Sequence, residues 1–174
     1  LGQTCHRFGQ YNNAERYLTK ANQFAPNNSE ILSALSTLYL TQGQLQQGWL
    51  LHDARMYSSN NDNYVDVNKL PLWDGNLLTS NDHLIIHTEQ GIGDEVMYAS
   101  LFPELENKPG TITIEADKRL IPCFKRSFPK LAFIEKQRGN SEFLQQFTKQ
   151  TWLASLPKFM RNRSDDFKPH NGYL

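Results

Sequence analysis

The sequence lacks an excess of charge of either sign, because 18 lysines and arginines balance 18 aspartates and glutamates. A chain without net charge has no overall field to attract nucleic acid or an anionic membrane surface, so we expect neither partner. No apolar run approaches the roughly 20 residues that a membrane-spanning helix needs, so we expect no membrane span. The only two cysteines, Cys5 and Cys123, lie far apart in the sequence. This spacing argues against a disulfide framework and predicts two lone buried thiols.

Metal-ligand patterns are also sparse. His83 and His87 are four residues apart, but they lie in a stretch with the composition of a strand. The zinc-binding pair with this spacing needs a helix, on which both side chains share one face. The other histidines are scattered along the chain. We therefore expect no metal site and no cofactor.

The sequence does contain an internal repeat. A shift of 34 residues superimposes positions of similar size or hydrophobicity, such as Leu1 on Leu35, Gly9 on Gly43 and Ala14 on Gly48. A period of this length is typical of tetratricopeptide repeats, and the residues resemble that family. The first copy follows the family pattern at Leu1-Gly2, Gly9, Tyr11, Ala14, Ala21 and Pro26. Residues 1–57 are therefore predicted to form helical hairpins of the tetratricopeptide type.

The repeat pattern also predicts local structure. Helices are expected near 11–24, 29–42 and 45–57, with a partial helix before Gly9. Gly9 and Gly43 lie where one helix must end and turn into the next, which requires a positive φ. Ala14 and Gly48 are small enough for two helices to approach closely. Ser29 is predicted to cap the helix that it begins.

The second copy departs from the repeat pattern, because Arg55 replaces a small residue and no proline closes the repeat. Each repeat normally buries one face against the next, so we expect this last copy to dock on the region that follows. The stripe of Leu35, Leu38 and Tyr39 is predicted to be core. The chain begins inside a repeat at Leu1, which we interpret as the start of a fragment.

Residues 58–80 change to loop chemistry, with a run of serine, asparagine and aspartate and with a turn at Asp74-Gly75. We interpret this stretch as a linker or docking segment ahead of a second domain over 81–174. Trp73 is a large apolar residue in polar surroundings. It is predicted to fill the seam between the two regions, and stacking on a ligand is the alternative.

The second region alternates short apolar strands with helices. The predicted strands are 83–88, 111–116, 131–135 and 151–153, and the predicted helices are 96–105, 117–127 and 141–149. Continuous apolar runs rich in β-branched residues are typical of buried parallel strands. Their alternation with helices predicts a Rossmann-like parallel sheet wrapped by helices.

The turn after the first strand has the composition of a binding loop, Gln90-Gly91-Ile92-Gly93-Asp94. Ligands of open α/β sheets bind outside the carboxyl ends of the strands, and a helix N-terminus offers free N–H groups to a phosphate or sugar oxygen. We therefore predict ligand contacts from Gln90, Gly91, Gly93 and Glu95, and from Glu115 at the end of the next strand. Asp94 and Glu95 place negative charge at the same point, and both could instead be helix-capping carboxylates.

The order of the pieces resembles bacterial tetratricopeptide proteins that carry a glycosyltransferase-like domain of the GT-B type, similar to the heptosyltransferase family. The matching pieces, in order, are the repeats, Pro71-x-Trp73-Asp74-Gly75, His87-x-Glu89-Gln90-Gly91-x-Gly93-Asp94, Tyr98-Ala99 with Pro103, Glu115 and Ser155-Leu156-Pro157. The resemblance implies a fold of α plus α/β class, in which the second region is the N-terminal half of a GT-B fold. It also implies that Asp94 is the base that takes the proton of the acceptor hydroxyl.

The resemblance further implies what the chain needs for catalysis. The leaving nucleotide phosphate requires positive charge or N–H donors, which in GT-B proteins come mainly from a second Rossmann-like domain. That domain does not follow before Leu174, so we expect the chain alone to be inactive and to bind a nucleotide sugar only together with it.

We therefore expect part of a cytoplasmic glycosyltransferase-like protein whose repeats bind a protein or peptide. One alternative is a protein-interaction scaffold without catalysis, and another is a nucleotide-binding Rossmann-like module. A homodimer that covers the truncated sheet remains open.

Overall fold

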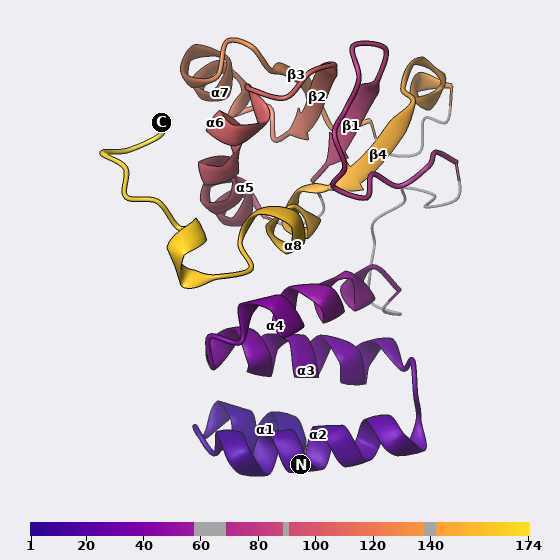
Figure 1. The fold of residues 1–174 in the computed structure, drawn as a ribbon, viewed down its shortest axis with the longest axis vertical. Helices are drawn as coiled ribbons and strands as arrows, with labels where there is room; N and C mark the ends of the chain where they lie inside the picture. Colours follow the sequence, from indigo (N-terminus) through magenta and orange to yellow (C-terminus); the bar gives the residue numbers. More distant parts are fainter. Residues whose placement is uncertain (58–68, 89–90, 138–141) are drawn as a thin grey trace. The chain divides into compact units, whose positions relative to one another are not determined.

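The computed structural model describes residues 1–57, 69–88, 91–137 and 142–174 (Figure 1). Its contacts divide the chain into a helical unit, Leu1–Asp62 with Pro157–Lys168, and a sheet unit, Asn63–Leu156 with Pro169–Leu174. The helices together with a parallel sheet agree with the expected α plus α/β class. Residues 81–174 were expected to form one domain, whereas the contacts group Pro157–Lys168 with the helices. Among the described residues, no helix combines the length and hydrophobicity needed to cross a bilayer.

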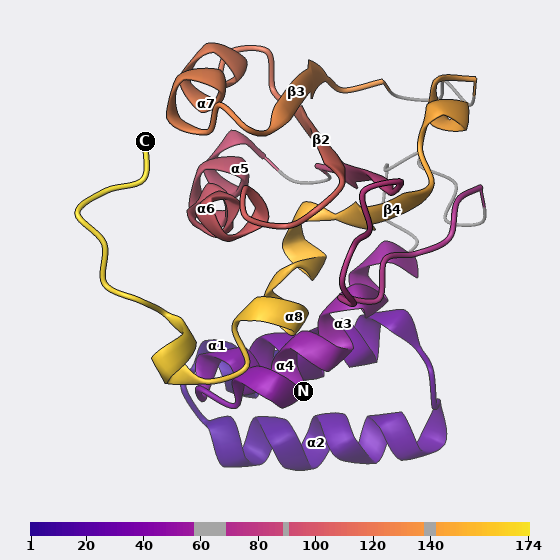
Figure 2. The ribbon, with the colours of Figure 1, turned by 45° about the horizontal axis from the view of Figure 1, so that its top comes forward.

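The helical unit is built from helices that pack against their neighbours in the chain (Figures 1 and 2). Its elements are α1 (Gly2–Arg7), α2 (Tyr11–Phe24), α3 (Ser29–Thr41), α4 (Leu45–His52), the 3-10 turns η1 (Asp53–Tyr57) and η5 (Ser164–Asp166), and α8 (Pro157–Met160). Gly9 and Gly43 have φ angles of 71° and 75° between successive helices. Both left-handed turns and the helices predicted over 11–24 and 29–42 are confirmed to within one residue. The helix predicted over 45–57 ends at His52 and continues as the 3-10 turn η1.

Small and branched apolar residues form the core of the helical unit. Ala14, Leu18, Leu35 and Leu38 are buried together, and Tyr39 packs against them. A Cβ added to Gly48 would lie 2.6 Å from Cγ of Leu40. That contact is far inside van der Waals distance, so α3 and α4 approach as closely as the small residue permits.

The cap of α3 differs from the prediction by one residue. The side-chain oxygen of Asn28 accepts hydrogen bonds from the backbone N–H groups of Glu30 and Ile31, both at 3.1 Å. Ser29 is the first helical residue and not the cap. Asparagine and serine cap helices about equally well, so composition alone could not choose between the two adjacent residues.

The C-terminal segment of the helical unit is held by two polar contacts to α4 and η1. The indole Nε1–H of Trp49 donates to the backbone carbonyl of Arg161 at 2.8 Å. The ammonium of Lys158 pairs with the carboxylate of Asp53. These contacts explain why a segment more than 100 residues further along the chain belongs to this unit.

The sheet unit has four parallel strands in the order β3-β2-β1-β4. Its elements are β1 (His83–His87), α5 (Ile92–Tyr98), η2 (Ala99–Leu101), α6 (Phe102–Leu105), β2 (Thr111–Ala116), α7 (Ile121–Ser127), β3 (Ala132–Glu135), η3 (Phe143–Gln146), β4 (Lys149–Trp152) and η4 (Leu153–Ser155). β4 adds beside β1, so the strand order reverses between these two strands. Such a reversal is where open α/β sheets usually bind ligands.

The three predicted helices of the sheet unit differ from expectation: the first is interrupted and the other two are shorter. The helix predicted over 96–105 is broken into α5, η2 and α6 because Pro103 has no N–H to continue it. The helix predicted over 117–127 begins only at Ile121, because the Asp117 carboxylate accepts the N–H of Arg119 and closes a turn. Of the helix predicted over 141–149, the described part, 142–149, contains only the 3-10 turn η3, since Lys149 already pairs with Leu84 in the sheet.

The two faces of the sheet differ in chemistry. Leu84 and Ile86 alternate with Ile85 along β1, so they lie on the opposite face. One face packs under an aromatic cluster of Phe102, Phe124, Phe128 and Phe133, to which α6, α7 and β3 contribute. On the other face, Ile85 packs with Leu144 and Phe147. By the strand register, this second face also carries His83, His87, Thr113, Glu115 and Gln150.

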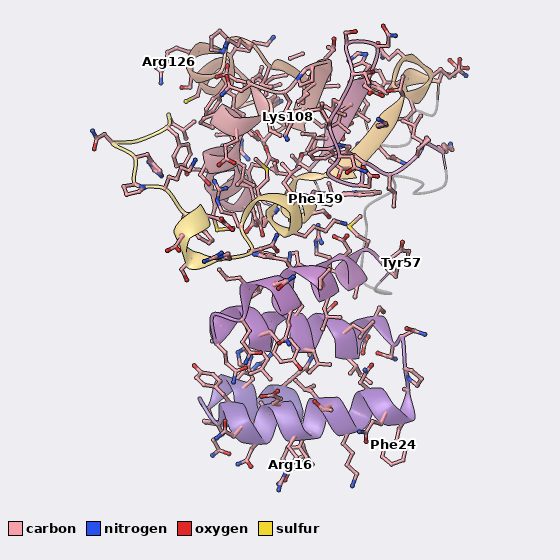
Figure 3. The ribbon with its side chains drawn as sticks, viewed as in Figure 1. Arg16, Phe24, Tyr57, Lys108, Arg126 and Phe159 are labelled. Carbon is pink, nitrogen blue, oxygen red and sulfur yellow. The ribbon has the colours of Figure 1, made fainter. Side chains whose placement is uncertain are left out.

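Trp73 is buried inside the sheet unit. Its backbone N–H donates to the carbonyl of Gln150 at 2.8 Å, and its indole Nε1–H donates to the carbonyl of Asn76 at 2.9 Å. Figure 3 labels Lys108 among the side chains of the sheet unit. Its ammonium lies 5.4 Å from the centre of a Trp73 ring. A ring buried in this way argues against the alternative of stacking on a ligand. The two cysteines are free thiols, and both are only partly buried.

Candidate functional site

The predicted binding loop follows β1 and leads into α5. Gly91 and Gly93 are exposed at the start of this helix, and Gln90 lies outside the described residues. A Cβ added to Gly93 would meet no described residue within 4 Å. The backbone is therefore open to an approaching ligand at this point.

Asp94 is half-buried and caps its own helix. Its Oδ2 accepts a hydrogen bond from the backbone N–H of Gly91 at 3.2 Å, which agrees with the capping alternative. The second carboxylate oxygen has no hydrogen-bond partner among the residues that the structure describes. One oxygen thus holds the turn, and the other remains available.

Glu95, the next residue, has a different environment. Only 1% of its surface is exposed. Its Oε2 accepts the backbone N–H of Asp117 at 2.8 Å, and its Oε1 lies 2.7 Å from the ammonium of Lys136. Glu95 therefore contacts the residues that follow β2 and β3, and it does not face solvent as a ligand contact would.

Glu115 is also buried, in a polar network that crosses the sheet. Its Oε2 lies 2.8 Å from Nδ1 of His87, and its Oε1 accepts the backbone N–H of Gln137 at 3.0 Å. The other ring nitrogen of His87 lies 3.3 Å from Oε1 of Gln150, whose amide nitrogen donates to the carbonyl of Leu70. The network joins the carboxyl ends of β1 and β2 to β4.

The charge at this edge of the sheet is largely balanced by local contacts. Hydrogen bonds from the side chain and the backbone N–H of Arg119 hold the pKa of Asp117 well below its usual range. Asp117 is thus ionised at neutral pH and pairs with the guanidinium at 2.8 Å. Within the described residues, no three histidine, cysteine, aspartate or glutamate side chains gather in a way that could hold a metal ion.

The structure therefore separates the five predicted site residues that it describes. Gly91, Gly93 and Asp94 lie together at the open start of α5, Glu95 and Glu115 lie buried beneath the strand ends, and Gln90 is not described. The partners of the two glutamates, which are His87, Gln150 and Lys136, were not among the predicted site residues. Strand alternation could have placed His87 and Glu115 on one face, since the register pairs the neighbouring residues Ile86 and Ile114.

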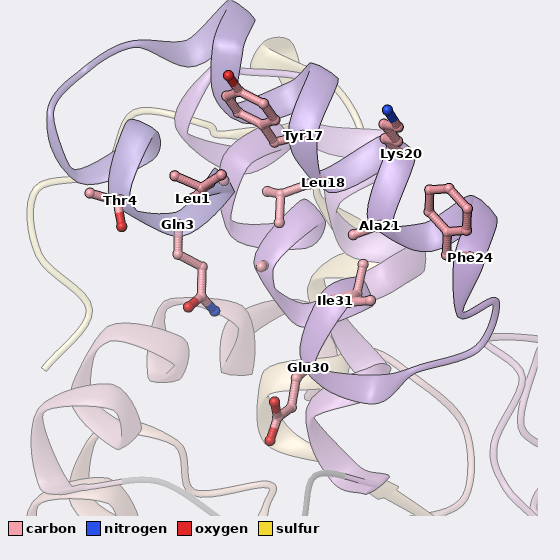
Figure 4. A pocket seen from close by; sticks show the side chains of 12 residues that line it. Leu1, Gln3, Thr4, Tyr17, Leu18, Lys20, Ala21, Phe24, Glu30 and Ile31 are labelled. Atoms are coloured by element: carbon pink, nitrogen blue, oxygen red, sulfur yellow. The ribbon is translucent and has the colours of Figure 1, made fainter.

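The helical unit contains a second candidate site, a cavity of about 490 Å³ between α1, α2 and the start of α3 (Figure 4). Its apolar lining includes Leu18, Ala21, Phe24, Ile31 and Ala34, and its polar lining includes Gln3, Thr4, Lys20 and Glu30. Phe24 is 80% exposed. A cavity of about 190 Å³ adjoins it, shares Gln3, Leu18 and Ala34, and adds His6, Arg7 and Thr37.

Comparison with known proteins gives one similarity. No protein family and no solved structure matches the chain. The chain is 33% identical over 157 residues to Protein FlbA of Caulobacter vibrioides, in an alignment that covers 81% of this chain and 26% of that protein. The chain thus spans about a quarter of the length of the curated relative that it matches.

Proposed function

We propose that the chain is part of a cytoplasmic, bacterial glycosyltransferase-like protein in which tetratricopeptide-type repeats precede half of a GT-B fold. In this proposal the sheet unit supplies the acceptor side of the sugar-transfer site. The observation that carries the proposal is the placement of Asp94. Its carboxylate lies at the start of α5, which follows β1, the strand beside which the strand order reverses. One carboxylate oxygen accepts the N–H of Gly91, and the other has no partner among the described residues.

The chemistry of sugar transfer fits this placement. An alcohol is a weak nucleophile, and a carboxylate within hydrogen-bond reach can take its proton as the new glycosidic bond forms. The open backbone at Gly93 leaves space for the acceptor beside Asp94. The hydrogen bond from Gly91 fixes the carboxylate without occupying its second oxygen.

The donor side of the reaction needs groups beyond those described above. A leaving nucleotide phosphate requires cations or N–H donors. Two cations near the strand ends, Lys136 and Arg119, already lie against Glu95 and Asp117. This supports a nucleotide-sugar site completed by a second domain, and we expect the 174-residue chain alone to transfer no sugar.

The proposal predicts a large effect of Asp94→Asn in the full-length protein. The amide oxygen still accepts the N–H of Gly91, so the turn remains capped, but the side chain can no longer take a proton. We expect transfer from nucleotide sugars to slow by about 100-fold to 10,000-fold. Nucleotide release with a panel of nucleotide sugars measures the rate, and isothermal titration measures donor binding.

Asp166→Asn is the matched control, because the carboxylate of Asp166 likewise accepts the backbone N–H of the residue three positions earlier, Arg163, but it lies in the helical unit. We expect donor binding and transfer to remain within about twofold of the unmodified protein in this variant. Unchanged transfer in Asp94→Asn would remove Asp94 as the base. Transfer by the isolated chain would contradict the need for a second domain.

The cavity in the helical unit favours a second candidate, a protein-interaction scaffold without catalysis. An apolar cavity of about 490 Å³ beside a polar one suits side chains of a protein or peptide partner (Figure 4). Under this alternative, the full-length protein binds no nucleotide sugar and captures a partner through its repeats. Ala21→Glu would abolish that capture, whereas Asn13→Glu, which adds the same charge at an exposed site on α2, would not.

A third candidate, a nucleotide-binding Rossmann-like module, predicts that this chain alone binds nucleotides. Titration of the isolated chain with nucleotides and with nucleotide sugars tests it.

A further inference from the structure

We propose that Glu95 is a positioning residue for Asp94, acting through its contacts with Asp117 and Lys136. This inference rests on the proposed function in one respect, because that function gives the position of Asp94 a catalytic use. The geometry itself can be tested without any activity.

Glu95 links three segments at one edge of the sheet. It lies in α5, and its two oxygens contact the residues that follow β2 and β3, Asp117 at 2.8 Å and Lys136 at 2.7 Å. A single buried carboxylate thus fixes the start of α5 relative to two strand ends.

α5 needs contacts beyond itself to hold its start in place. It contains only seven residues, and isolated helices of fewer than about 12 residues are marginal in water. The hydrogen bond between Asp94 and Gly91 joins residues within the same turn, so it cannot orient that turn relative to the sheet. Long-range contacts must do so, and Glu95 makes two of them next to Asp94.

Small displacements of a catalytic base change the reaction rate strongly. A shift of about 1 Å in a reacting group can slow catalysis by about 100-fold. Glu95 itself is a poor candidate for the base, because it is buried and both its oxygens already have contacts. It acts on the position of Asp94 and not on the substrate.

The test uses the full-length protein with three variants, Glu95→Gln, Lys136→Met and the double variant. Glu95→Gln keeps the shape of the side chain and an acceptor for the Asp117 N–H, but it loses the ion pair. Glu106→Gln is the matched control, since Glu106 likewise accepts a backbone N–H across the chain, from Lys130, but it follows α6.

Hydrogen exchange, followed by mass spectrometry in peptides that cover 91–98, reports on the start of α5. We expect Glu95→Gln and Lys136→Met each to raise exchange there by about tenfold, and the double variant to resemble the single ones because the two residues act as one pair. Glu106→Gln is expected to leave exchange in 91–98 unchanged.

Kinetics separate positioning from a general loss of structure. At a temperature where every variant is folded, we expect Glu95→Gln to lower kcat by about 10-fold to 100-fold, with KM for the nucleotide sugar within about twofold. Unchanged exchange in 91–98 in both single variants would overturn the inference, whatever the activity. If hydrogen exchange rose in the variants but the unmodified protein transferred no sugar, the structural role of Glu95 would stand and the proposed function would be rejected.

Discussion

In the helical unit, buried polar side chains contact groups that are near in sequence, whereas in the sheet unit they join distant strands. The hydroxyl of Ser36 donates to the carbonyl of Gly48, 12 residues away, and contacts His52, 16 residues away. His87 instead contacts Glu115, 28 residues away, and Gln150, 63 residues away. The C-terminal segment around Arg161 is the exception in the helical unit.

This difference teaches where each unit can tolerate change. A helical hairpin forms its contacts between helices that are adjacent in the chain, so the loss of one polar group leaves its neighbours in place. A buried network across three strands must be satisfied as a whole, because each unpaired member then faces a medium of low polarity. The following predictions test this contrast.

The largest effect is expected for His87→Leu. Among the described residues, the variant leaves the buried Glu115 carboxylate with one hydrogen-bond partner, the backbone N–H of Gln137. Leaving a buried carboxylate without its side-chain partner typically costs about 3 kcal/mol or more. Urea unfolding at neutral pH, followed by tryptophan fluorescence, measures the loss, since Trp73 and Trp152 both lie in the sheet unit.

The double variant with Glu115→Leu is the control for this prediction. Removal of both partners also removes the unpaired charge, so we expect most of the lost stability to return. In the helical unit, Ser36→Ala is expected to cost only about 1 kcal/mol, the usual value of one hydrogen bond. Equal losses for Ser36→Ala and His87→Leu would contradict the contrast between the units.

A smaller effect, confined to the helical unit, is expected from pH. Burial, with a further contribution from Arg55, lowers the pKa of His52 from 6.5 to about 4. The folded state therefore favours the neutral imidazole, and the unfolded chain binds the proton first as the pH falls. Stability is complete above pH 6.5 and decreases by about 3 kcal/mol as the pH falls from 6.5 to 4.

Unfolding of the unmodified chain and of His52→Asn at pH 7.5, 6, 5 and 4 measures this dependence. We expect the difference in stability between the two proteins to decrease steadily below pH 6.5. A constant difference across this range would show that His52 does not titrate between these values.

Local features of the fold were predictable from the sequence, and contacts between distant residues were not. The helix positions and the left-handed turns at Gly9 and Gly43 were predictable, because period, turn chemistry and capping are local properties. The strands were predictable within two residues at each end, since continuous apolar runs mark buried parallel strands. The pairing of β4 with β1 was not predicted, because it depends on residues 65 positions apart, such as Leu84 and Lys149.

The candidate site was predictable only in part for the same reason. The glycines and Asp94 lie in one turn, so the local pattern brings them together. Glu95 and Glu115 share the same charge and were assigned the same role, but their burial is set by Lys136 and His87, which come from other strand ends. No local pattern distinguishes a carboxylate that faces a ligand from one that closes a buried contact.

The smallest effect is expected at the start of α3, where Asn28→Ala removes the side-chain oxygen that accepts the N–H groups of Glu30 and Ile31. Loss of such a cap typically costs about 1 kcal/mol. Ser29→Ala is the matched control, because Ser29 is already helical and alanine has the higher helix propensity, so we expect no loss there. Urea unfolding followed by far-ultraviolet circular dichroism compares the two variants. If Ser29→Ala were the more destabilising variant, the cap would be at Ser29, and the prediction from the sequence would have been correct at this residue as well.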